Sequence, residues 1–529
     1  MTKHYLDRLA RTINENWDSP ALTDFYLTDD GAAQDTSRGN HYTYGELYQE
    51  ILRLNELFKN LGLQKGDHIA SCGANSAHWA IAYLAIAAYQ GVAVTILHSQ
   101  SLEDIAHQID FSDAKALFTD SDLWEDLQNQ SIPQVEHVIG LENWQILRGK
   151  ESKIDNRKSI IDNREAHFEC GDPDEMAMIC FTSGSTSTSK GIMLSNRNMS
   201  NNAKNITDGY PDADVTAFLS VLPMAHIYGF MTEILAQLLK GKHVCVLGVV
   251  SISTLYDAIR IVRPYAFSFI PFLLSSLIKA HRDCISLLKD CKQIYIGGSL
   301  FDKDLEDELL NAKVPISIGY GQTETGPLIS YSVSADYKAG TCGRIVEGMT
   351  ARIAPTGEIL VKGENVMLGY YKDPEATARK IDSDGWLHTG DKGHLDEDGY
   401  LYVEGRLEQD IIVLPNGENI RPDNIESLIN ALPEVSESIV LARNGHLVAL
   451  VVPATPSSVS SASSVTSASS ASSETSETSA SSPSSSLRRK ILRTVNPSLP
   501  LFSQLYDVEI TDQPLARTEK QTLKRYLYS

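Results

Sequence analysis

Apolar runs that resemble β-strands alternate with helix-like stretches through most of this chain, and this alternation constrains the fold more than any other feature. Strand-like runs occupy 176–183, 242–250 and 293–298, whereas 43–62 and 254–262 have the apolar spacing of helices. Because strands separated by helices generally pair in parallel, the pattern predicts an α/β fold with a largely parallel sheet.

The length of the chain and a change of texture predict two domains. A single hydrophobic core rarely supports a chain of 529 residues. From about Gly357, short strands and tight turns replace the helices, and Asp398-Gly399 is a strong hairpin signal. A further set of strands and helices begins near Gly405. We therefore predict an N-terminal domain over 1–404 and a C-terminal domain over 405–529.

A Ser-rich tract interrupts the predicted C-terminal domain over 455–486. Ser, Ala and Thr dominate it, so it cannot bury enough apolar surface to offset the entropy lost on ordering. We therefore predict a flexible linker. Three roles stay open for it: a harmless loop extension, an effect on access of a thiol substrate, or contact with a partner.

Charge and cysteine content restrict the partners and the compartment. The formal net charge of −22 disfavours nonspecific binding to nucleic acid and docking on an anionic membrane. The seven cysteines are scattered, form no CxxC pair and are odd in number, which favours buried thiols in a reducing compartment. We therefore expect a cytoplasmic protein without nucleic acid.

Two segments bear on targeting and membranes. The N-terminal segment lacks the apolar core of a secretory signal, and its acidic residues disfavour a transit peptide. The uncharged stretch 79–97 has about the length of a membrane span, but Gln90-Gly91 divides it into a helix-like and a strand-like half. We predict a buried helix, a turn and a buried strand rather than a transmembrane helix.

The strongest local signal is the loop FTSGSTSTSKG at 181–191, which follows an apolar strand. Small hydroxyl residues and a glycine can direct backbone N–H groups and hydroxyls toward phosphate oxygens, and Lys190 supplies a positive charge. The loop does not match the Walker pattern GxxxxGK[ST]. By itself the run is also compatible with an ordinary surface loop.

This run resembles the phosphate-loop signature of the adenylate-forming superfamily, which contains acyl-CoA synthetases, luciferases and the adenylation domains of peptide synthetases. Other segments resemble further motifs of that superfamily in the same order: PMAHIYGF (223–230), GGS (297–299), YGQTE (320–324), WLHTGD (386–391), and GR (405–406) with NGENIRPDNIE (416–426). The resemblance covers nearly the whole chain except the Ser-rich tract. Six motifs in the expected order make a chance match very improbable.

The resemblance implies a fold and a set of site residues. The expected fold is a large N-terminal domain of helix-flanked β-sheets with a small β-barrel-like part, followed by a small mobile α+β domain. The residues implied to contact the ATP phosphates are Thr182, Ser183, Gly184, Ser185, Thr186, Lys190 and, at the α-phosphate, Thr323. The implied adenosine-binding residues are Gly298, Tyr320, Gly321, Asp391 and Arg406.

Two further roles come from the same resemblance. Glu324 resembles the Mg²⁺ ligand, and a hard carboxylate beside a triphosphate suits that ion. His226 resembles a residue that flanks the carboxylate of the acid, although a lone histidine is often only a packed core residue. The segment lacks the Asp that amino-acid-activating relatives place near this position, which favours a simple carboxylic acid.

The sequence departs from the superfamily pattern in the phosphate loop and in the C-terminal domain. Ser187 and Ser189 replace the usual Gly and Pro, which changes the backbone freedom of the loop. The usual C-terminal PxTxxGK motif reads LARTEKQTLKR here, so Lys520 and Lys524 are both candidates for the catalytic lysine, and we favour Lys520. The register of the expected hinge, within 406–410, stays open.

The resemblance predicts an enzyme that uses ATP, Mg²⁺ and coenzyme A to activate a carboxylic acid, with a fatty acid as the first candidate. It forms an acyl-adenylate and then a thioester, releasing pyrophosphate and AMP. One alternative is transfer to a carrier protein. Another is a non-catalytic descendant that binds a nucleotide or acyl chain. Peripheral membrane contact stays open for a long lipid substrate.

Overall fold

The chain divides into two compact units, Met1–Leu407 and Glu408–Ser529. The structure is a computed structural model, and it describes residues 4–28, 34–35, 38–150, 164–181, 190–211, 217–248, 250–407, 412–415, 418–454, 483–515 and 528. The boundary lies three residues beyond the predicted 404/405 division, because β21 (Leu401–Arg406) pairs with a strand of the first unit.

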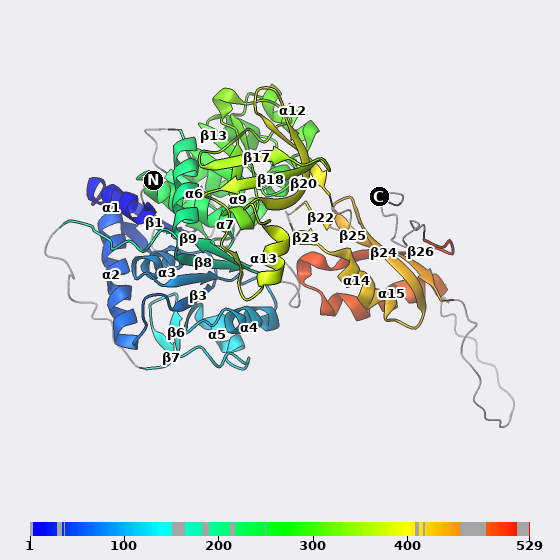
Figure 1. The fold of residues 1–529 in the computed structure, drawn as a ribbon, viewed down its shortest axis with the longest axis horizontal. Helices are drawn as coiled ribbons and strands as arrows, with labels where there is room; N and C mark the ends of the chain where they lie inside the picture. Colours follow the sequence, from blue (N-terminus) through cyan, green and yellow to red (C-terminus); the bar gives the residue numbers. More distant parts are fainter. Residues whose placement is uncertain are drawn as a thin grey trace. The chain divides into compact units, whose positions relative to one another are not determined.

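An eight-stranded sheet forms the centre of the first unit (Figure 1). Its strands, in order, are β19 (Gly369–Tyr370), β9 (Gly191–Ser195), β8 (Met176–Phe181), β4 (Val92–Thr95), β3 (His68–Cys72), β5 (Ala116–Thr119), β6 (His137–Gly140) and β7 (Ile146–Arg148). The five strands from β8 to β6 are parallel, and the pairs at both edges are antiparallel. The predicted strand 176–183 corresponds to β8, and its last two positions lie outside the described residues.

Helices cover this sheet. They are α1 (Tyr5–Glu15), α2 (Tyr44–Leu61), α3 (Ala77–Ala88), α4 (Leu102–Phe111), α5 (Ser121–Leu127) and α6 (Asn196–Gly209). The predicted helix 43–62 corresponds to α2, which Thr43 and Glu46 cap reciprocally and which ends at Gly62 in a left-handed conformation. Such caps satisfy backbone groups that a helix end leaves without partners.

The uncharged stretch 79–97 is a buried helix followed by a turn and a buried strand, as predicted. Helix α3 packs against β3, β4 and α2, and strand β4 begins directly after Gly91. The ring of Phe230 lies 3.9 Å from that of Tyr83 and 6.1 Å from that of Trp79. The apolar character of α3 thus reflects burial on all sides within protein. In the described part of the chain, no helix is long and apolar enough to cross a membrane.

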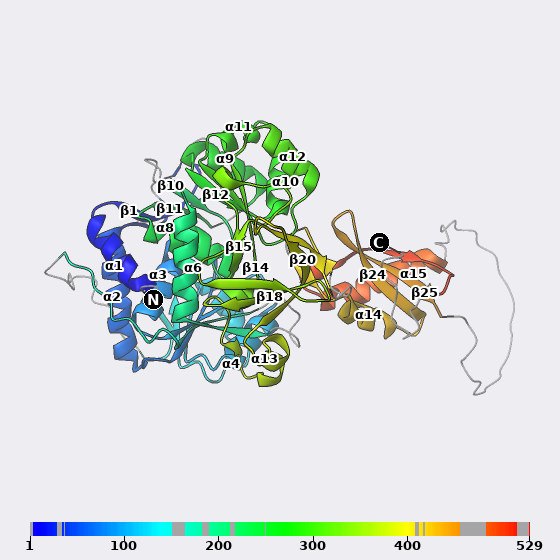
Figure 2. The ribbon, with the colours of Figure 1, turned by 45° about the horizontal axis from the view of Figure 1, so that its top comes forward.

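Two smaller sheets complete the α/β part. One contains β10 (Ala217–Ser220), β11 (His243–Leu247), β1 (Pro20–Phe25) and β2 (His41–Thr43). The other contains β12 (Ala266–Phe269), β13 (Gln293–Ile296), β14 (Ile316–Gly321), β15 (Leu328–Tyr331) and β16 (Arg344–Ile345). Figure 2 shows α9 (Ile252–Val262), α10 (Pro271–Ala280), α11 (Cys284–Lys289) and α12 (Lys303–Asn311) gathered beside the second of these sheets.

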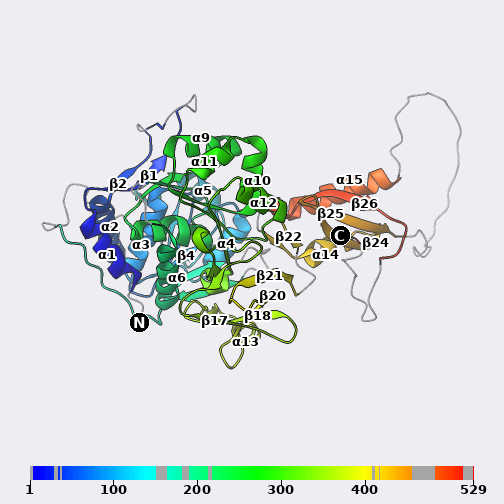
Figure 3. The same ribbon diagram turned by 90° about the horizontal axis from the view of Figure 1, so that it is seen from above.

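The small β part is an antiparallel sheet of β17 (Met349–Ile353), β18 (Glu358–Gly363), β20 (Leu387–Leu395) and β21, which lie side by side in Figure 3. The predicted hairpin at Asp398-Gly399 joins β20 to β21, and Gly399 has a φ of +81°. Helix α13 (Pro374–Lys380) lies between β19 and β20 in the chain.

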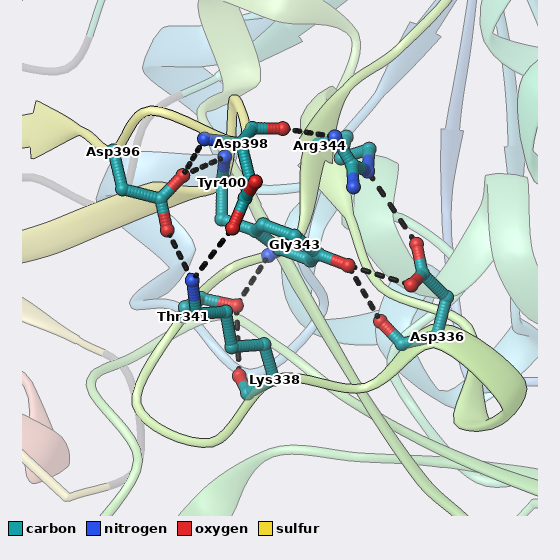
Figure 4. A network of polar contacts seen from close by, with 8 residues as sticks. All are labelled: Asp336, Lys338, Thr341, Gly343, Arg344, Asp396, Asp398 and Tyr400. Atoms are coloured by element: carbon teal, nitrogen blue, oxygen red, sulfur yellow. Dashed lines mark hydrogen bonds and ion pairs between the residues drawn. The ribbon is translucent and has the colours of Figure 1, made fainter.

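A polar network fixes this hairpin to the neighbouring segment (Figure 4). The hydroxyl of Tyr400 donates to Oδ1 of Asp336 at 2.6 Å, and the guanidinium of Arg344 lies 4.1 Å from the centroid of the Tyr400 ring. Nζ of Lys338 pairs with Oδ2 of Asp396 at 2.6 Å. Exposed ion pairs of this kind contribute only about 0–1 kcal/mol each, so the network chiefly orients the hairpin.

The second unit has an α+β fold. Its described elements are β22 (Ile412–Val413), β23 (Asn419–Ile420), α14 (Pro422–Asn430), β24 (Val435–Arg443), β25 (His446–Pro453), α15 (Pro483–Val495) and β26 (Leu505–Ile510). Strands β24 and β25 are antiparallel, β25 and β26 are parallel, and α14 and α15 contact the sheet. The linker predicted over 455–486 is too long by four residues, because α15 begins at Pro483.

Candidate active site

A buried carboxylate joins two of the predicted motifs. Asp391 lies on β20 and is only 5% exposed. The hydroxyl of Tyr320 donates to its Oδ2 at 2.6 Å, and Nε2 of Gln322 donates to the same oxygen at 2.7 Å. Hydrogen bonds to a charged acceptor are stronger than neutral ones, so the two donors compensate for the burial of this charge.

Hydrogen bonds from side chains to backbone groups further fix these two motifs. Nε2 of Gln322 also donates to the carbonyl of Thr389 at 2.8 Å. The hydroxyl of Thr389 donates to the carbonyl of Ile359 at 2.7 Å and accepts the N–H of Asp391 at 3.0 Å. Arg406 pairs with Asp391 across β20 and β21, although its side chain lies outside the described residues.

A second group of predicted residues meets at the start of β9. Thr323 and Glu324 lie on the short 3₁₀ helix η2 (Thr323–Thr325). The hydroxyl of Tyr370 donates to Oε1 of Glu324 at 2.8 Å. Nζ of Lys190 lies 4.6 Å from the centroid of the Tyr370 ring, within cation–π range. Lys190 and Glu324 therefore contact two parts of one tyrosine.

Glu324 fits a Mg²⁺ ion that arrives with a nucleotide. Mg²⁺ prefers oxygen ligands and usually keeps several waters together with one or two carboxylates and phosphate oxygens. Among the residues described, no three His, Cys, Asp or Glu side chains form a group that could hold a metal by themselves. The one half-buried carboxylate of Glu324 therefore suits an ion held mainly by phosphates.

His226 begins the short helix α7 (Ile227–Gly229), and its Nδ1 accepts the N–H of Tyr228 at 3.2 Å. Desolvation by the surrounding protein lowers the pKa of His226, although solvent still reaches the residue. The ring is therefore neutral at neutral pH. Because Nδ1 accepts a hydrogen bond, the proton lies on Nε2.

Two side chains clamp the segment that leads to His226. Oε2 of Glu233 accepts the N–H groups of Val221 and Leu222, both at 2.8 Å. Asn75 donates from Nδ2 to the carbonyl of Leu222 at 2.8 Å and accepts the N–H of Met224 at 2.9 Å. The position of this segment therefore depends on two residues that lie outside the predicted motifs.

Glu233 is itself unusual. It is fully buried on η1 (Phe230–Leu235), a π-helical turn followed by α8 (Ala236–Leu239), and such turns occur frequently at functional sites. Among the described residues, its Oε1 has no hydrogen-bond partner. Burial raises the pKa of Glu233 to about 8, although the hydrogen bonds to Oε2 act in the opposite direction.

The predicted glycines lie where a larger residue would be strained. Gly298 has a φ of +89°, a conformation that L-residues with a side chain rarely adopt. A Cβ at Gly321 would lie only 1.7 Å from the carbonyl oxygen of Pro327, so the last position of β14 requires glycine. Gly297 faces the ring of Tyr228, since a Cβ there would lie 3.4 Å from Cζ. The Gly-Gly turn and the His226 motif are thus neighbours.

The remaining predicted residues lie outside the described part of the chain. They are Thr182, Ser183, Gly184, Ser185 and Thr186 of the phosphate loop, the substituted positions Ser187 and Ser189, the hinge positions 408–410, and the two lysine candidates Lys520 and Lys524. Their roles stay predictions. The ends of the phosphate loop are defined, because β8 and β9 form an antiparallel pair with Phe181 opposite Gly191.

Tyr370, Asn75 and Glu233 lie outside the predicted motifs. Tyr370 follows a glycine in an ordinary aromatic pair, and only pairing of β19 with β9 brings it to Lys190. Glu233 is an acidic residue within the largely apolar segment 230–239. Because acidic residues are rarely buried, its position in such a segment could have indicated a special role.

Two family models match this chain. A family model described as AMP-binding enzyme matches residues 9–371, which is more than half of the chain. This chain belongs to the AMP-binding enzyme family. A second model, for the C-terminal domain of AMP-binding enzymes, matches residues 409–528. These matches confirm the predicted membership of the adenylate-forming superfamily. The CoA ligases of that superfamily use ATP, Mg²⁺, coenzyme A and a small-molecule acid.

Similar proteins include several CoA ligases. The AMP-binding enzyme is 26% identical over 443 residues to 4-coumarate–CoA ligase 3 of Oryza sativa subsp. japonica, covering 79% of this chain and 78% of that protein. It is 34% identical over 298 residues to indoleacetate–CoA ligase of Aromatoleum aromaticum, covering 53% and 58%. These matches support an acid–CoA ligase of the adenylate-forming type.

Solved structures show the same fold. O-Succinylbenzoate CoA synthetase of Bacillus subtilis superposes with a TM-score of 0.75 at 22% identity, covering 98% of this chain and 97% of that one. The amide bond synthetase of Marinactinospora thermotolerans gives a TM-score of 0.73 at 21% identity, with 99% of both chains covered. The predicted mixed α/β architecture with a small C-terminal domain is confirmed.

Proposed function

We propose that this AMP-binding enzyme joins a carboxylic acid to coenzyme A in two steps. In the first, a carboxylate oxygen bonds to the α-phosphorus of ATP while the bond to the bridging oxygen breaks, so pyrophosphate leaves and an acyl-adenylate forms. In the second, the thiol sulfur bonds to the acyl carbon, AMP leaves with the electron pair of the broken C–O bond, and the thiol proton passes to solvent. Carboxylates are weak nucleophiles, so positioning and charge stabilisation dominate the first step.

The convergence of separate motifs into two connected groups carries this proposal. Asp391 with Tyr320 forms the group that would bind adenosine, where the carboxylate accepts both ribose hydroxyls and the tyrosine ring stacks on adenine. Glu324 with Lys190 forms the group that would contact the phosphates and hold their Mg²⁺, and a bound Mg²⁺ would supply positive charge opposite the phosphates. The two groups join because Gln322, two residues before Glu324, also donates to Asp391.

Other predicted residues complete the proposed site. Thr323 would donate to the α-phosphate, Arg406 would assist at the ribose, and Gly298 and Gly321 would let the backbone approach the nucleotide. The loop residues Thr182, Ser183, Gly184, Ser185 and Thr186 would surround the phosphates. Neutral His226 would donate from Nε2 to the carboxylate of the acid.

The C-terminal domain has a separate proposed role. Lys520 would reach the reacting carboxylate and the α-phosphate in the first step, and its positive charge would stabilise the developing negative charge. Rotation of the domain about a hinge within 406–410 would then bring different residues to the thioester step. The cytoplasmic location predicted from the scattered cysteines is part of the same proposal.

The 223–230 segment lacks an acidic residue that would bind an amino group, which favours a simple carboxylic acid over an amino acid. A fatty acid is the first candidate of this class. An aromatic acid is the second candidate. It is favoured by the similarity to ligases whose names specify 4-coumarate and indoleacetate. Both candidates share an uncharged organic body attached to a carboxylate.

The test is ATP–pyrophosphate exchange with Mg²⁺, using a fatty acid series, 4-coumarate, indoleacetate and benzoate, followed by addition of coenzyme A to the most active acid. Exchange, with AMP release that requires coenzyme A, is the expected result. Exchange without turnover of coenzyme A would favour a carrier protein as the acceptor. Absence of exchange with every acid, in folded protein that binds ATP, would overturn the proposed reaction for these substrates and favour a non-catalytic nucleotide-binding protein.

A further inference from the structure

Tyr370 makes two different contacts with residues of the proposed phosphate and metal site. Its hydroxyl donates to Oε1 of Glu324 at 2.8 Å, and its ring lies 4.6 Å from Nζ of Lys190. The two charged residues come from segments more than a hundred positions apart in the sequence. One tyrosine therefore links a carboxylate and an ammonium group that are both proposed to contact the nucleotide phosphates.

The backbone around Tyr370 is held on several sides. It pairs with Ile192 across β19 and β9, and its N–H donates to Oγ1 of Thr377 at 2.8 Å. The next residue, Tyr371, donates its N–H to the carbonyl of Gly191 at 2.7 Å. Tyr370 is 6% exposed. Because the backbone and ring of Tyr370 are already held in place, orienting its neighbours costs little additional conformational entropy.

The segment just before β19 also fixes the backbone of Glu324. The N–H of Met367 donates to the carbonyl of Glu324 at 2.9 Å. Residues within 367–370 thus restrain both the backbone and the side chain of Glu324. The phenol O–H is the donor of the hydrogen bond to Glu324, because an ionised carboxylate can only accept.

We propose that Tyr370 is a positioning residue that orients Glu324 toward the nucleotide-bound Mg²⁺ and Lys190 toward the phosphates. The inference rests on the proposed function of the site and adds a residue to it. The hydroxyl occupies one lone-pair direction of Oε1 and fixes the plane of the carboxylate, which determines where its other lone pairs point. The ring face attracts the ammonium group of Lys190 and limits its rotamers.

Tyr370→Phe separates the two contacts, because it removes the hydroxyl and keeps the ring. Tyr371→Phe is the matched control, since the hydroxyl of Tyr371 donates to Asp113 at 2.6 Å rather than to Glu324. The first measurement is calorimetric binding of ATP with and without Mg²⁺. We expect Tyr370→Phe to weaken binding of Mg–ATP by about tenfold or more and to leave binding of metal-free ATP unchanged, as expected when a supporting residue of a metal ligand is lost.

Tyr370→Leu removes the ring as well, and we expect it to weaken binding of both forms of ATP. In pyrophosphate exchange, Tyr370→Phe should raise the half-saturating Mg²⁺ concentration by a similar factor, whereas Tyr371→Phe should not. Unchanged Mg–ATP affinity in Tyr370→Phe, or an equal loss in both phenylalanine variants, would overturn the proposal.

The binding measurement separates this inference from the proposed reaction. If the wild-type enzyme catalyses no exchange, the proposed function fails, but a Mg²⁺-specific loss of ATP affinity in Tyr370→Phe still supports the role of Tyr370. If Mg²⁺ has no effect on ATP binding by the wild-type protein, both ideas fail. Circular dichroism and thermal unfolding establish that each variant is folded before binding is compared.

Discussion

The hydroxyl of Tyr320 donates a hydrogen bond of 2.6 Å to Oδ2 of Asp391, although 71 residues separate them in the sequence. The tyrosine lies next to the end of β14 in one sheet, and the aspartate lies on β20 of another. The adenosine side of the proposed site therefore depends on how two sheets of the first unit pack. Because this contact centres on Asp391, Asp391 is the first residue to test.

Asp391→Asn should raise the KM for ATP about tenfold or more in pyrophosphate exchange. The amide has one acceptor oxygen in place of two, and a hydrogen bond to a charged group contributes about 1.5–3 kcal/mol. Asp398→Asn is the control, because it removes the same charge from a side chain that is 72% exposed and 3.5 Å from Lys338. An equal KM in the two variants would contradict the assignment of Asp391 to the ribose.

Glu324→Gln should lower the rate of pyrophosphate exchange by about a hundredfold and raise the Mg²⁺ requirement, because an amide is a weaker ligand for a hard cation than a carboxylate. Glu347→Gln provides the comparison. Its side chain is 74% exposed and pairs with Lys204 at 2.6 Å. Exchange at the wild-type rate in Glu324→Gln would remove Glu324 from the metal site.

Glu233→Gln should change how stability depends on pH. The folded-state pKa of Glu233 is raised to about 8 from its ordinary value of 4.5, so the folded protein retains a proton that the unfolded chain releases between these values. The contribution of this group to the free energy of unfolding is therefore greatest at low pH and declines as pH rises toward about 8.

The glutamine variant lacks this titration. Its stability relative to the wild type should therefore increase by up to about 1.4 kcal/mol per pH unit between about pH 5 and pH 8, and then level off. Scanning calorimetry of both proteins across this range measures the difference. A difference that does not vary with pH would show that Glu233 is ionised throughout.

Asn75→Ala should affect the acid rather than the nucleotide. The substitution leaves the carbonyl of Leu222 and the N–H of Met224 without their partner, at a cost of about 1–3 kcal/mol for each group that stays buried. The segment before His226 then loses its clamp. We expect a higher KM for the carboxylic acid with little change in the KM for ATP, and a parallel rise in both constants would instead indicate a general loss of structure.

Lys520→Ala should reduce acyl-adenylate formation by two orders of magnitude or more, roughly the effect of removing a charge that stabilises a transition state. The thioester step, started from a synthetic acyl-adenylate and coenzyme A, should change little. Lys524→Ala is the matched variant, because it removes the same charge four positions away. The reverse pattern, with Lys524 essential and Lys520 dispensable, would reassign the role.

Much of the local structure could be predicted from the sequence. Helix α2 begins and ends at the residues that its caps require, and the division of 79–97 at Gly91 separates α3 from β4. The linker boundary was wrong at one end, because Pro483 and the serines that follow it form the first turn of α15. Proline is favoured in the first turn of a helix, whereas Ser-rich composition suggested a coil.

The order of the motifs, the family and the chemical type of each predicted ligand depend on residue identity and spacing along the chain, so they can be read from the sequence. The contacts of Tyr370 with Lys190 and Glu324, and the burial and raised pKa of Glu233, depend on tertiary packing. Those properties arise when β19 pairs with β9 and when η1 packs into the core. The electrostatic environment of a side chain is set by atoms that lie close in space, most of them distant in sequence.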